Sequence, residues 1–524
     1  MHSDSCTLGS TSNNIYNQQL EFSNPTEKRR ELRFLREIDY LLSILQTALG
    51  DMVNGLIPLE FSRLLRRSSG VLAMIQRYCS HHCRIGAKLD WLKGFFAFEV
   101  HRTTLTREVI AGLTTFTTMS YIVVANPGIL SAAGIPEGPS FVATALVAAF
   151  GCYLMAFYAK RPFAVAPYMG ENAFIAFTVC RVLGIRWQAA LAAIFIAGVL
   201  FILMTVLHLR RWVVESIPAS LRFSFAVGMG LFLTFIGLNE TGIVRLGVPG
   251  APVQAGQLST PPVLVAMFGV VLLAILLIRK VPGAILLSIV ITAVVAFLTR
   301  VAPPPKALVS MPPSLRPILW QLDFHEAFTW KAFPVVLTLF IMAFVDTMGT
   351  LIGVSARAGF LDKDGHLPQI ERPMLVDAIT TTLAPALGTS TSGAFLESAT
   401  GIETGGRTGF TALVTGSCFL LTLFFAPFVA SIPAAAYGPA LIIVGLFMLA
   451  PIVHIDFADY TESIPAFAVV SLMSFTFNIA IGICAGFVLY PICKIAGGKA
   501  QQLKSGLWVL TALSLLFFIF YPYR

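Results

Sequence analysis

Charged residues are scarce in this chain of 524 residues. Only 12% are Asp, Glu, Lys or Arg, against roughly 25% in a typical soluble domain, and this scarcity excludes an ordinary soluble fold. Hydrophobic residues make up 56% of the chain and the mean hydropathy is +0.79. Apolar runs near 20 residues recur from about residue 108 to 521, and each is long enough to cross a bilayer as a helix. We therefore predict an all-α polytopic membrane protein.

Histidine is also sparse, with 8 in the whole chain. Those outside the span centres include His81, His82, His101, His208, His325, His366 and His454. A membrane enzyme would need a constellation of histidines or metal ligands at the interface. Because the chain offers no such set, we predict that it is not an enzyme and that it uses no cofactor.

Cysteine usage predicts neither disulfides nor a metal centre. The chain has 8 Cys, five of which lie in or beside apolar spans, where cysteine acts as a small packing residue. The cluster from Cys79 to Cys83 contains two histidines, but its spacing is cramped and no second ligand pair follows, unlike a zinc site. The net charge of +9 does not indicate nucleic acid as a partner, because Lys and Arg fall mostly in loops and the N-terminal segment.

Residues 1–90 read as a separate N-terminal extension. The first 27 are polar, which predicts disorder, and residues 1–30 lack the apolar core of a signal peptide. From Glu27 to about Leu72, leucines at helical spacing mix with basic residues, a pattern typical of an interfacial amphipathic helix. A dispensable extension, or a start codon chosen too far upstream, explains the same residues equally well.

The rest divides into a permease domain at 91–498 and a C-terminal apolar segment at 499–524. Fourteen spans are predicted at 108–131, 139–159, 165–181, 187–209, 216–239, 260–279, 281–300, 332–356, 371–388, 391–404, 408–430, 433–452, 462–476 and 477–496. A further stretch at 506–521 has only 16 residues, so it is either an interfacial segment or a short fifteenth span.

The spans form two sets that look like a repeat, at about 105–300 and 332–497. Ile217-Pro218-Ala219 opens the fifth span of the first set, and Ile432-Pro433-Ala434 opens the fifth of the second, 215 residues later. A short, polar-interrupted segment falls third in each set. Since each set has seven spans, the second must run inverted. Interrupted segments at corresponding positions of two halves mark a transporter's binding site.

The distribution of basic residues predicts the orientation. With the N-terminus in the cytoplasm, 14 Lys and Arg fall on the inside and 7 on the outside. This bias favours a cytoplasmic N-terminus in a multi-pass plasma or inner membrane protein.

Few ionisable residues lie deep in the predicted spans. Glu397 stands in a Gly- and Ser-rich stretch, Asp346 lies mid-span, and Glu171 and Asn172 lie in the third span. Intramembrane charge is costly and usually functional, and irregular backbone at that depth is tolerated only around a cavity. The structural alternatives are a paired Asp346, an Asn172 that bridges helices, and a Glu171 that faces water at a helix start.

These side chains suit a polar, uncharged, planar substrate. Carboxylate oxygens accept bonds from ring N–H groups, an Asn amide both donates and accepts, and half-helix N-termini offer free backbone N–H groups. A buried carboxyl that loads a proton on one side and releases it on the other would couple transport to a proton gradient. We predict that Glu397 and Asp346 carry the proton, and that Asn172, Glu171, Ser392 and Thr115 join them in binding substrate.

From about Trp91 to Gly498 the chain resembles the AzgA-like purine permeases (hypoxanthine, guanine, adenine), a branch of the nucleobase:cation symporter-2 family. The matching blocks are Ala111–Phe116 with Ala125–Gly128, Ala166–Ala173, Asp346–Gly353, Glu397–Gly401 with Gly405–Gly409, and Thr461–Phe467. The resemblance implies 14 spans in two inverted seven-span repeats, a core and a gate domain, and short β-strands before the third and tenth helices. It also implies purine uptake with H⁺, and site residues at Asn172, Asp346 and Glu397.

One position departs from the family pattern. Family members commonly have a further Asp three residues before the Asp-Thr-x-Gly-Thr block, and this chain has Ala343 there. Glu171 adds a carboxylate nearby. A transporter of the same fold for uracil, xanthine or an inorganic anion is the alternative; the preferred purine, H⁺ against Na⁺, and a homodimer are left open.

Overall fold

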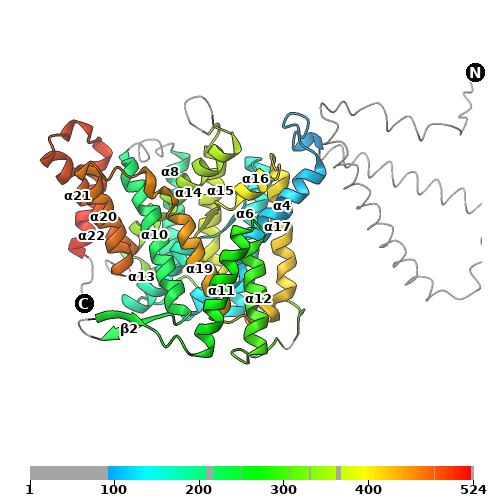
Figure 1. Ribbon diagram of the computed structural model, residues 1–524. Helices are drawn as coiled ribbons and strands as arrows, with labels where there is room; N and C mark the ends of the chain where they lie inside the picture. The colour runs from blue at the N-terminus through cyan, green and yellow to red at the C-terminus, as the bar shows by residue number, and fades with distance from the viewer. Residues whose placement is uncertain are drawn as a thin grey trace, which may run out of the picture. The chain divides into compact units, whose positions relative to one another are not determined.

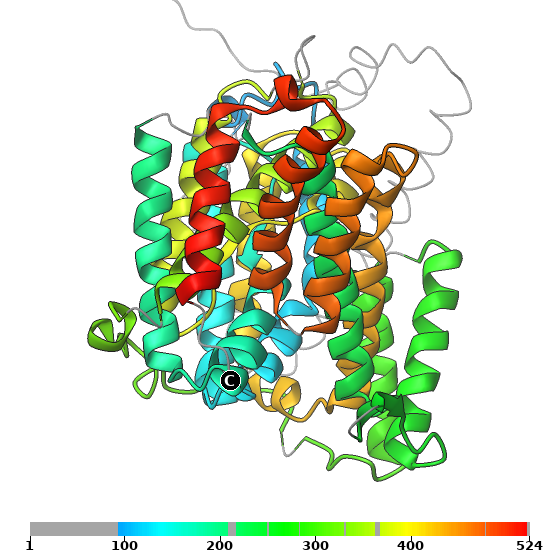
Figure 2. The same cartoon turned by 90° about the vertical axis from the view of Figure 1, so that its left-hand side faces the viewer.

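The computed structural model is mostly helical and describes residues 93–207, 216–248, 251–281, 283–305, 307–329, 332–361, 367–476 and 478–520. The predictions made for residues 1–90, including the Cys79–Cys83 cluster, lie outside the described residues. The described chain begins with a short turn and then forms long helices that run roughly side by side (Figures 1 and 2).

The elements before residue 300 follow the predicted spans closely. They are α4 (Leu105–Met119), α5 (Ile122–Ser131), α6 (Glu137–Leu154), the π-helical η1 (Met155–Ala159), β1 (Val165–Pro167), α7 (Met169–Ala173), the π-helical η2 (Phe174–Val182), α8 (Trp187–Val206), α10 (Ala219–Glu240), β2 (Val244–Val248), β3 (Ala251–Ala255), α11 (Pro261–Ile278) and α12 (Ala284–Leu298).

The elements after residue 300 continue the pattern. They are α13 (Phe324–Ala327), α14 (Phe333–Ala358), α15 (Glu371–Leu387), β4 (Ser392–Ala394), α16 (Ser398–Glu403), α17 (Gly409–Thr422), the 3₁₀ turn η3 (Leu423–Phe425), α18 (Ala426–Ala430), α19 (Ala434–Met448), the 3₁₀ turn η4 (Ala450–His454), α20 (Tyr460–Phe475), α21 (Ile479–Ala496), the 3₁₀ turn η5 (Ala500–Gln502) and α22 (Ser505–Phe520).

Within the described residues, nine helical stretches are long and apolar enough to cross a membrane. They are Leu105–Ser131, Glu137–Ala159, Trp187–Val206, Ala219–Glu240, Pro261–Ile278, Phe333–Ala356, Gly409–Ala430, Ala434–His454 and Ile479–Ala496. Ala284–Leu298 and Ser505–Ile519 are shorter apolar helices. The prediction of a helical, multi-pass membrane protein is confirmed at this level.

Proline and glycine explain several helix boundaries. Pro218 and Pro433 are the N-cap residues of α10 and α19, and a proline disfavours helical backbone at the residue before it. Helix α15 ends at Gly388, which takes a left-handed φ of 93° that favours glycine. The chain then turns into β4.

The helices pack in two groups. In one group α4, α6 and α17 pack together, and α8 packs on α14 and α15. In the other, α10 packs on α19 and α20, α11 on α12 and α19, and α20 on α21. Figure 1 shows α10, α19, α11 and α12 side by side. Helix α7 contacts both α10 and α14, so the segment that carries Asn172 lies where the two groups meet.

Two three-residue strands pair where the helices are broken. Strands β1 and β4 are antiparallel, with Val165 opposite Ala394 and Pro167 opposite Ser392. Both strands are completely buried, and pairing satisfies backbone groups that lipid could not. The short strands expected at the starts of 165–181 and 391–404 are therefore present.

One strand pair was not predicted. The sequence indicates no strand between the spans at 216–239 and 260–279, but β2 and β3 form an antiparallel hairpin there, with Val244 opposite Ala255. Its strands are short and outside the apolar spans, so hydropathy carried no signal for them. Figure 1 shows β2 at one end of the bundle and α16 toward the other.

Candidate functional site

The two broken segments are held together by bonds beyond the strand pair. The backbone N–H of Tyr168 donates to Thr391 (3.0 Å) and that of Phe395 to Ala164 (3.0 Å). The Ala164 N–H donates to the Ser398 hydroxyl at 2.9 Å. The Tyr168 ring stacks on Phe395, with centroids 5.8 Å apart. This crossing fixes the first residues of α7 and α16 against each other.

An amide and hydroxyl network extends from the crossing. The Asn172 Nδ2 donates to Asn126 Oδ1 at 2.6 Å. Asn126 Nδ2 in turn donates to Thr144 Oγ1 at 2.7 Å and to Thr389 Oγ1 at 2.9 Å. All four side chains are buried. Asn172 therefore bridges helices, as the structural alternative predicted, but its Oδ1 has no hydrogen-bond partner within the described residues.

Several buried polar atoms around this network have no hydrogen-bond partner within the described part of the chain. They are Glu171 Oε1 and Oε2, Asn172 Oδ1, Asp377 Oδ1, and the hydroxyls of Ser390, Thr391 and Ser392. Buried polar atoms are normally paired, because an unmet one costs free energy. A group of unmet atoms at one crossing indicates a place where a polar ligand or water binds.

Three acidic residues lie near enough to the Tyr168 phenol to interact with it. Asp377, Asp346 and Glu171 all interact with it electrostatically, and its hydroxyl lies 3.3 Å from Thr347 Oγ1. Asp377 Oδ2 accepts the N–H of Ala394 in β4 at 3.0 Å, so this acid anchors the crossing. Across the described ranges, no group of three or more His, Cys, Asp or Glu is arranged to hold a metal ion.

Glu397 stands slightly apart from the unmet atoms. It is the N-cap residue of α16, and its Oε1 accepts the Tyr121 hydroxyl at 3.0 Å. Thr115 is buried on α4, where it faces Gly401 of α16. The structure thus brings Glu171, Asn172, Ser392 and Asp346 together at the crossing, while Glu397 and Thr115 contact the neighbouring α5 and α16.

Four residues with buried polar side chains were not predicted as candidate site residues from the sequence. Asp377 lies inside the predicted span 371–388, so the rule that intramembrane charge is costly applied to it as well. Asn126 and Tyr168 appeared only inside matching blocks. Glu108 stands at the first position of the predicted span 108–131 and was not considered, but it is completely buried.

The close packing of α16 on α4 yields a steric prediction. A Cβ on Gly401 would overlap Thr115 Oγ1 and lie 2.6 Å from the Ala111 carbonyl oxygen. We expect Gly401→Ala to force α16 outward and to lower both uptake and the thermal unfolding midpoint, at a cost of about 1–3 kcal/mol. Fluorescence-monitored melting in detergent measures this. Gly94→Ala, where a Cβ meets no atom within 4 Å, is the matched control; equal losses in both variants would contradict the steric argument.

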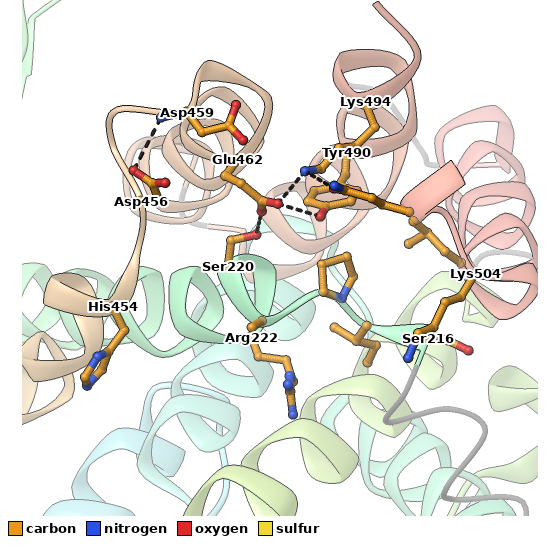
Figure 3. Close-up of a pocket in the computed structure, with 15 residues that line it drawn as sticks. Ser216, Ser220, Arg222, His454, Asp456, Asp459, Glu462, Tyr490, Lys494 and Lys504 are labelled. Atoms are coloured by element: carbon orange, nitrogen blue, oxygen red, sulfur yellow. Dashed lines mark hydrogen bonds and ion pairs between the residues drawn. The ribbon is translucent and has the colours of Figure 1, made fainter. Parts of the chain in front are cut away.

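A separate cavity of about 630 Å³ lies where α10 begins, α20 begins and α21 ends (Figure 3). Glu462 is its centre: Oε1 pairs with Lys494 Nζ at 2.6 Å and accepts the Tyr490 hydroxyl at 2.9 Å. Its other oxygen accepts the Ser220 hydroxyl. Lys494 is only 1% exposed and also donates to Gln502 at 2.8 Å. This network ties α10, α20 and α21 together. Arg222 also lines the cavity, and its Nε is buried without a hydrogen-bond partner in the described residues.

Two lysine–carboxylate pairs at this end offer a matched test. Lys494–Glu462 is buried at the lysine, whereas Lys499–Asp459 (2.5 Å) has a lysine that is 40% exposed. We expect Lys494→Met to destabilise the protein by about 3 kcal/mol, because the Glu462 charge loses its partner. Lys499→Met should cost less than about 1 kcal/mol. Urea or thermal unfolding in detergent measures both, and the prediction fails if the exposed pair proves as important.

Comparison with known proteins identifies the group to which this chain belongs. The Permease family matches residues 106–494. The chain is 37% identical over 429 residues to the adenine permease AdeP of Escherichia coli, covering 82% of this chain and 96% of AdeP. It is 38% identical over 440 residues to the guanine/hypoxanthine permease PbuG of Bacillus subtilis, covering 82% and 100%.

A solved structure shares the fold. The transmembrane domain of the cyanobacterial bicarbonate transporter BicA matches with a TM-score of 0.55 and 17% identity, covering 73% of this chain and 97% of that one. The resemblance predicted from the five sequence blocks is confirmed, and so is the prediction of a transporter in place of an enzyme. By the family match and by these relatives, the chain belongs to the Permease family.

Proposed function

We propose that this protein imports purine nucleobases, with hypoxanthine, guanine and adenine as the candidate substrates. The unmet buried atoms at the β1–β4 crossing carry the proposal, because carboxylate, amide and hydroxyl groups together match the donors and acceptors on the edges of a purine ring. Relatives named as adenine and guanine/hypoxanthine permeases support the same substrate class.

Alternating access is the proposed mode of transport. Glu171, Asn172 and Ser392 are 0% exposed in this conformation, so a substrate reaches them only if the surrounding helices move. The two helix groups are natural moving parts, with α4–α8 and α14–α17 as the core and α10–α12 and α19–α21 as the gate. We propose 14 spans in two inverted seven-span repeats, with the broken segments β1–α7 and β4–α16 at equivalent places.

Proton coupling is proposed through Glu397 and Asp346. Glu397 is partly buried and shares a hydrogen bond with Tyr121, which orders the carboxyl without neutralising it by a cation. Carboxyls at membrane depth serve as proton relays in transporters. The N-terminus is proposed to be cytoplasmic, from the excess of Lys and Arg on that side.

The alternative, a carrier of inorganic anions on the same fold, fits the site less well. The polar cluster gathers Glu171, Asp346 and Asp377, and carboxylates repel an anion. The likeness to BicA concerns the fold and leaves substrate choice to the side chains.

Uptake assays test the proposal. In a strain that lacks its own purine permeases, expression should produce uptake of labelled hypoxanthine, guanine or adenine that an uncoupling protonophore abolishes. Excess uracil, xanthine and bicarbonate serve as competitors. Failure to take up any of the three purines would overturn the proposed substrate class, and uptake that follows Na⁺ instead of H⁺ would overturn the coupling.

A further inference from the structure

We infer that Glu171 sets which purine is preferred, by accepting two parallel N–H bonds from one edge of the base, and that guanine is the base it favours. The inference rests on the proposed function, because it names the preferred member of the substrate class at the same site. It goes further by assigning the preference to one side chain.

The position of Glu171 supports this role. It lies in the first turn of α7, directly after β1, and its side chain is 0% exposed. Neither carboxylate oxygen makes a hydrogen bond of normal geometry within the described residues, although the Thr391 hydroxyl lies close enough to interact with the carboxyl group. The acid on the facing helix α14, Asp346, interacts with it electrostatically and supplies no N–H donor. Two acceptor oxygens are therefore presented beside the Thr391 hydroxyl, with bonding capacity left for a ligand or water.

A structural carboxylate in the same protein looks different. Glu108 is equally buried, but its oxygens accept the N–H of Arg407 at 2.9 Å, the N–H of Thr408 at 3.3 Å and the hydroxyl of Thr411 at 2.6 Å. The fold meets the bonding capacity of Glu108 and leaves that of Glu171 unmet. Because burying an unmet polar group is costly, Glu171 is best explained by a ligand that completes it.

The atoms beside Glu171 are also richer in acceptors than in donors. Asn172 Nδ2 donates to Asn126 Oδ1 and, at 3.6 Å, to the Met169 sulfur, so the amide offers its unmet Oδ1. Thr391, which accepts the Tyr168 N–H through its backbone, adds a hydroxyl that can donate or accept. A ligand with several N–H donors therefore fits this side of the site.

Guanine has the edge that matches a carboxylate. Its ring N1–H and 2-amino group present two parallel N–H donors, which is the pattern that a carboxylate accepts in a bidentate manner. Hypoxanthine has the N1–H but lacks the amino group. Adenine has an amino group beside a ring nitrogen that is itself an acceptor and would face a carboxylate oxygen. A site built to bond a donor rejects analogues that lack it.

The test is Glu171→Gln, which keeps the size of the side chain and replaces one acceptor by a donor. Guanine, hypoxanthine and adenine compete against labelled hypoxanthine uptake, and their inhibition constants are compared. We expect guanine to be preferred by the natural protein and to weaken by about tenfold in the variant. Adenine should gain, because a Gln amide pairs with an amino group beside a ring acceptor. Glu171→Asp should keep guanine ahead of adenine, and the exposed Glu99→Gln should change nothing.

The outcomes separate the two proposals. If the natural protein takes up none of the purines, the proposed function falls and this inference falls with it. If it takes up purines but Glu171→Gln leaves their order unchanged, only this inference is overturned. If Glu171→Gln stops all uptake, calorimetry measures the binding of guanine and adenine to the purified variant. If Glu171→Gln does not fold, the same measurement is made on Glu171→Asp. This inference is overturned if Glu171→Gln still prefers guanine, or if its affinity for guanine and adenine falls equally. It is also overturned if Glu171→Asp loses the preference for guanine.

Discussion

Glu397→Gln should lower gradient-driven purine uptake by roughly 10- to 100-fold, the range expected when a charged acceptor worth about 1.5–3 kcal/mol is removed. The substitution keeps the size of the side chain, and a Gln oxygen still accepts the Tyr121 hydroxyl that lies 3.0 Å from Glu397. Local geometry is thereby retained while the group that takes up a proton is lost. Uptake of labelled hypoxanthine under an imposed pH gradient measures the effect, with insertion checked by surface labelling.

Two comparisons make this result specific. Glu403→Gln changes the last residue of the same short helix, where the side chain is exposed, and uptake should stay near the original level. In Glu397→Gln, the rate of exchange of labelled for unlabelled base without a gradient should fall less than the rate of net accumulation does. Equal accumulation by Glu397→Gln and the original protein would remove this residue from the coupling mechanism.

The second large effect is expected on stability. Glu108 of α4 accepts bonds from two backbone N–H groups and one hydroxyl around the start of α17. A carboxylate at a helix N-terminus is favourable, and its removal leaves buried donors unmet at about 1–3 kcal/mol each. We expect Glu108→Ala to reduce the free energy of unfolding by about 3–5 kcal/mol, measured by chemical or thermal unfolding in detergent.

The controls follow from the number of bonds lost. Glu108→Gln retains acceptor capacity at one oxygen and should fall between the natural protein and Glu108→Ala. Glu99→Ala removes an exposed carboxylate and should have little effect. A stable Glu108→Ala protein would mean that water replaces the lost acceptor, and the α4–α17 contact would then depend on apolar packing alone.

The long helices were predictable because the features that specify them lie in neighbouring residues of the sequence. The span predicted at 332–356 corresponds to Phe333–Ala358 and that at 216–239 to Ala219–Glu240, since apolar length and helix-starting prolines are properties of neighbouring residues. The three-residue strands β1 and β4 are too short to show any periodicity, and only the family resemblance indicated them.

The site was predictable in part, for a similar reason. The cost of intramembrane charge pointed to Glu397, Asp346 and Glu171 without knowledge of their contacts. The donor that pairs with each acid depends on the tertiary structure. For that reason the hydrogen bond from the Ala394 N–H to Asp377 and the burial of Glu108 were not predicted. Sequence distance hid the partners of Glu108, which lie about 300 positions away. Ala394 is only 17 positions from Asp377, but it belongs to a strand too short to be predicted from periodicity.

The paired broken segments also constrain how the protein is made. Ala164 bonds to the Ser398 hydroxyl across 234 positions, so the crossing closes only after most of the chain has left the ribosome. Until then β1 has no strand to pair with, and its unmet backbone must be tolerated inside the membrane or the insertion machinery. Biogenesis thus has a late committed step, and a chain truncated before β4 is expected to be a target for membrane quality control even though most of its helices are complete.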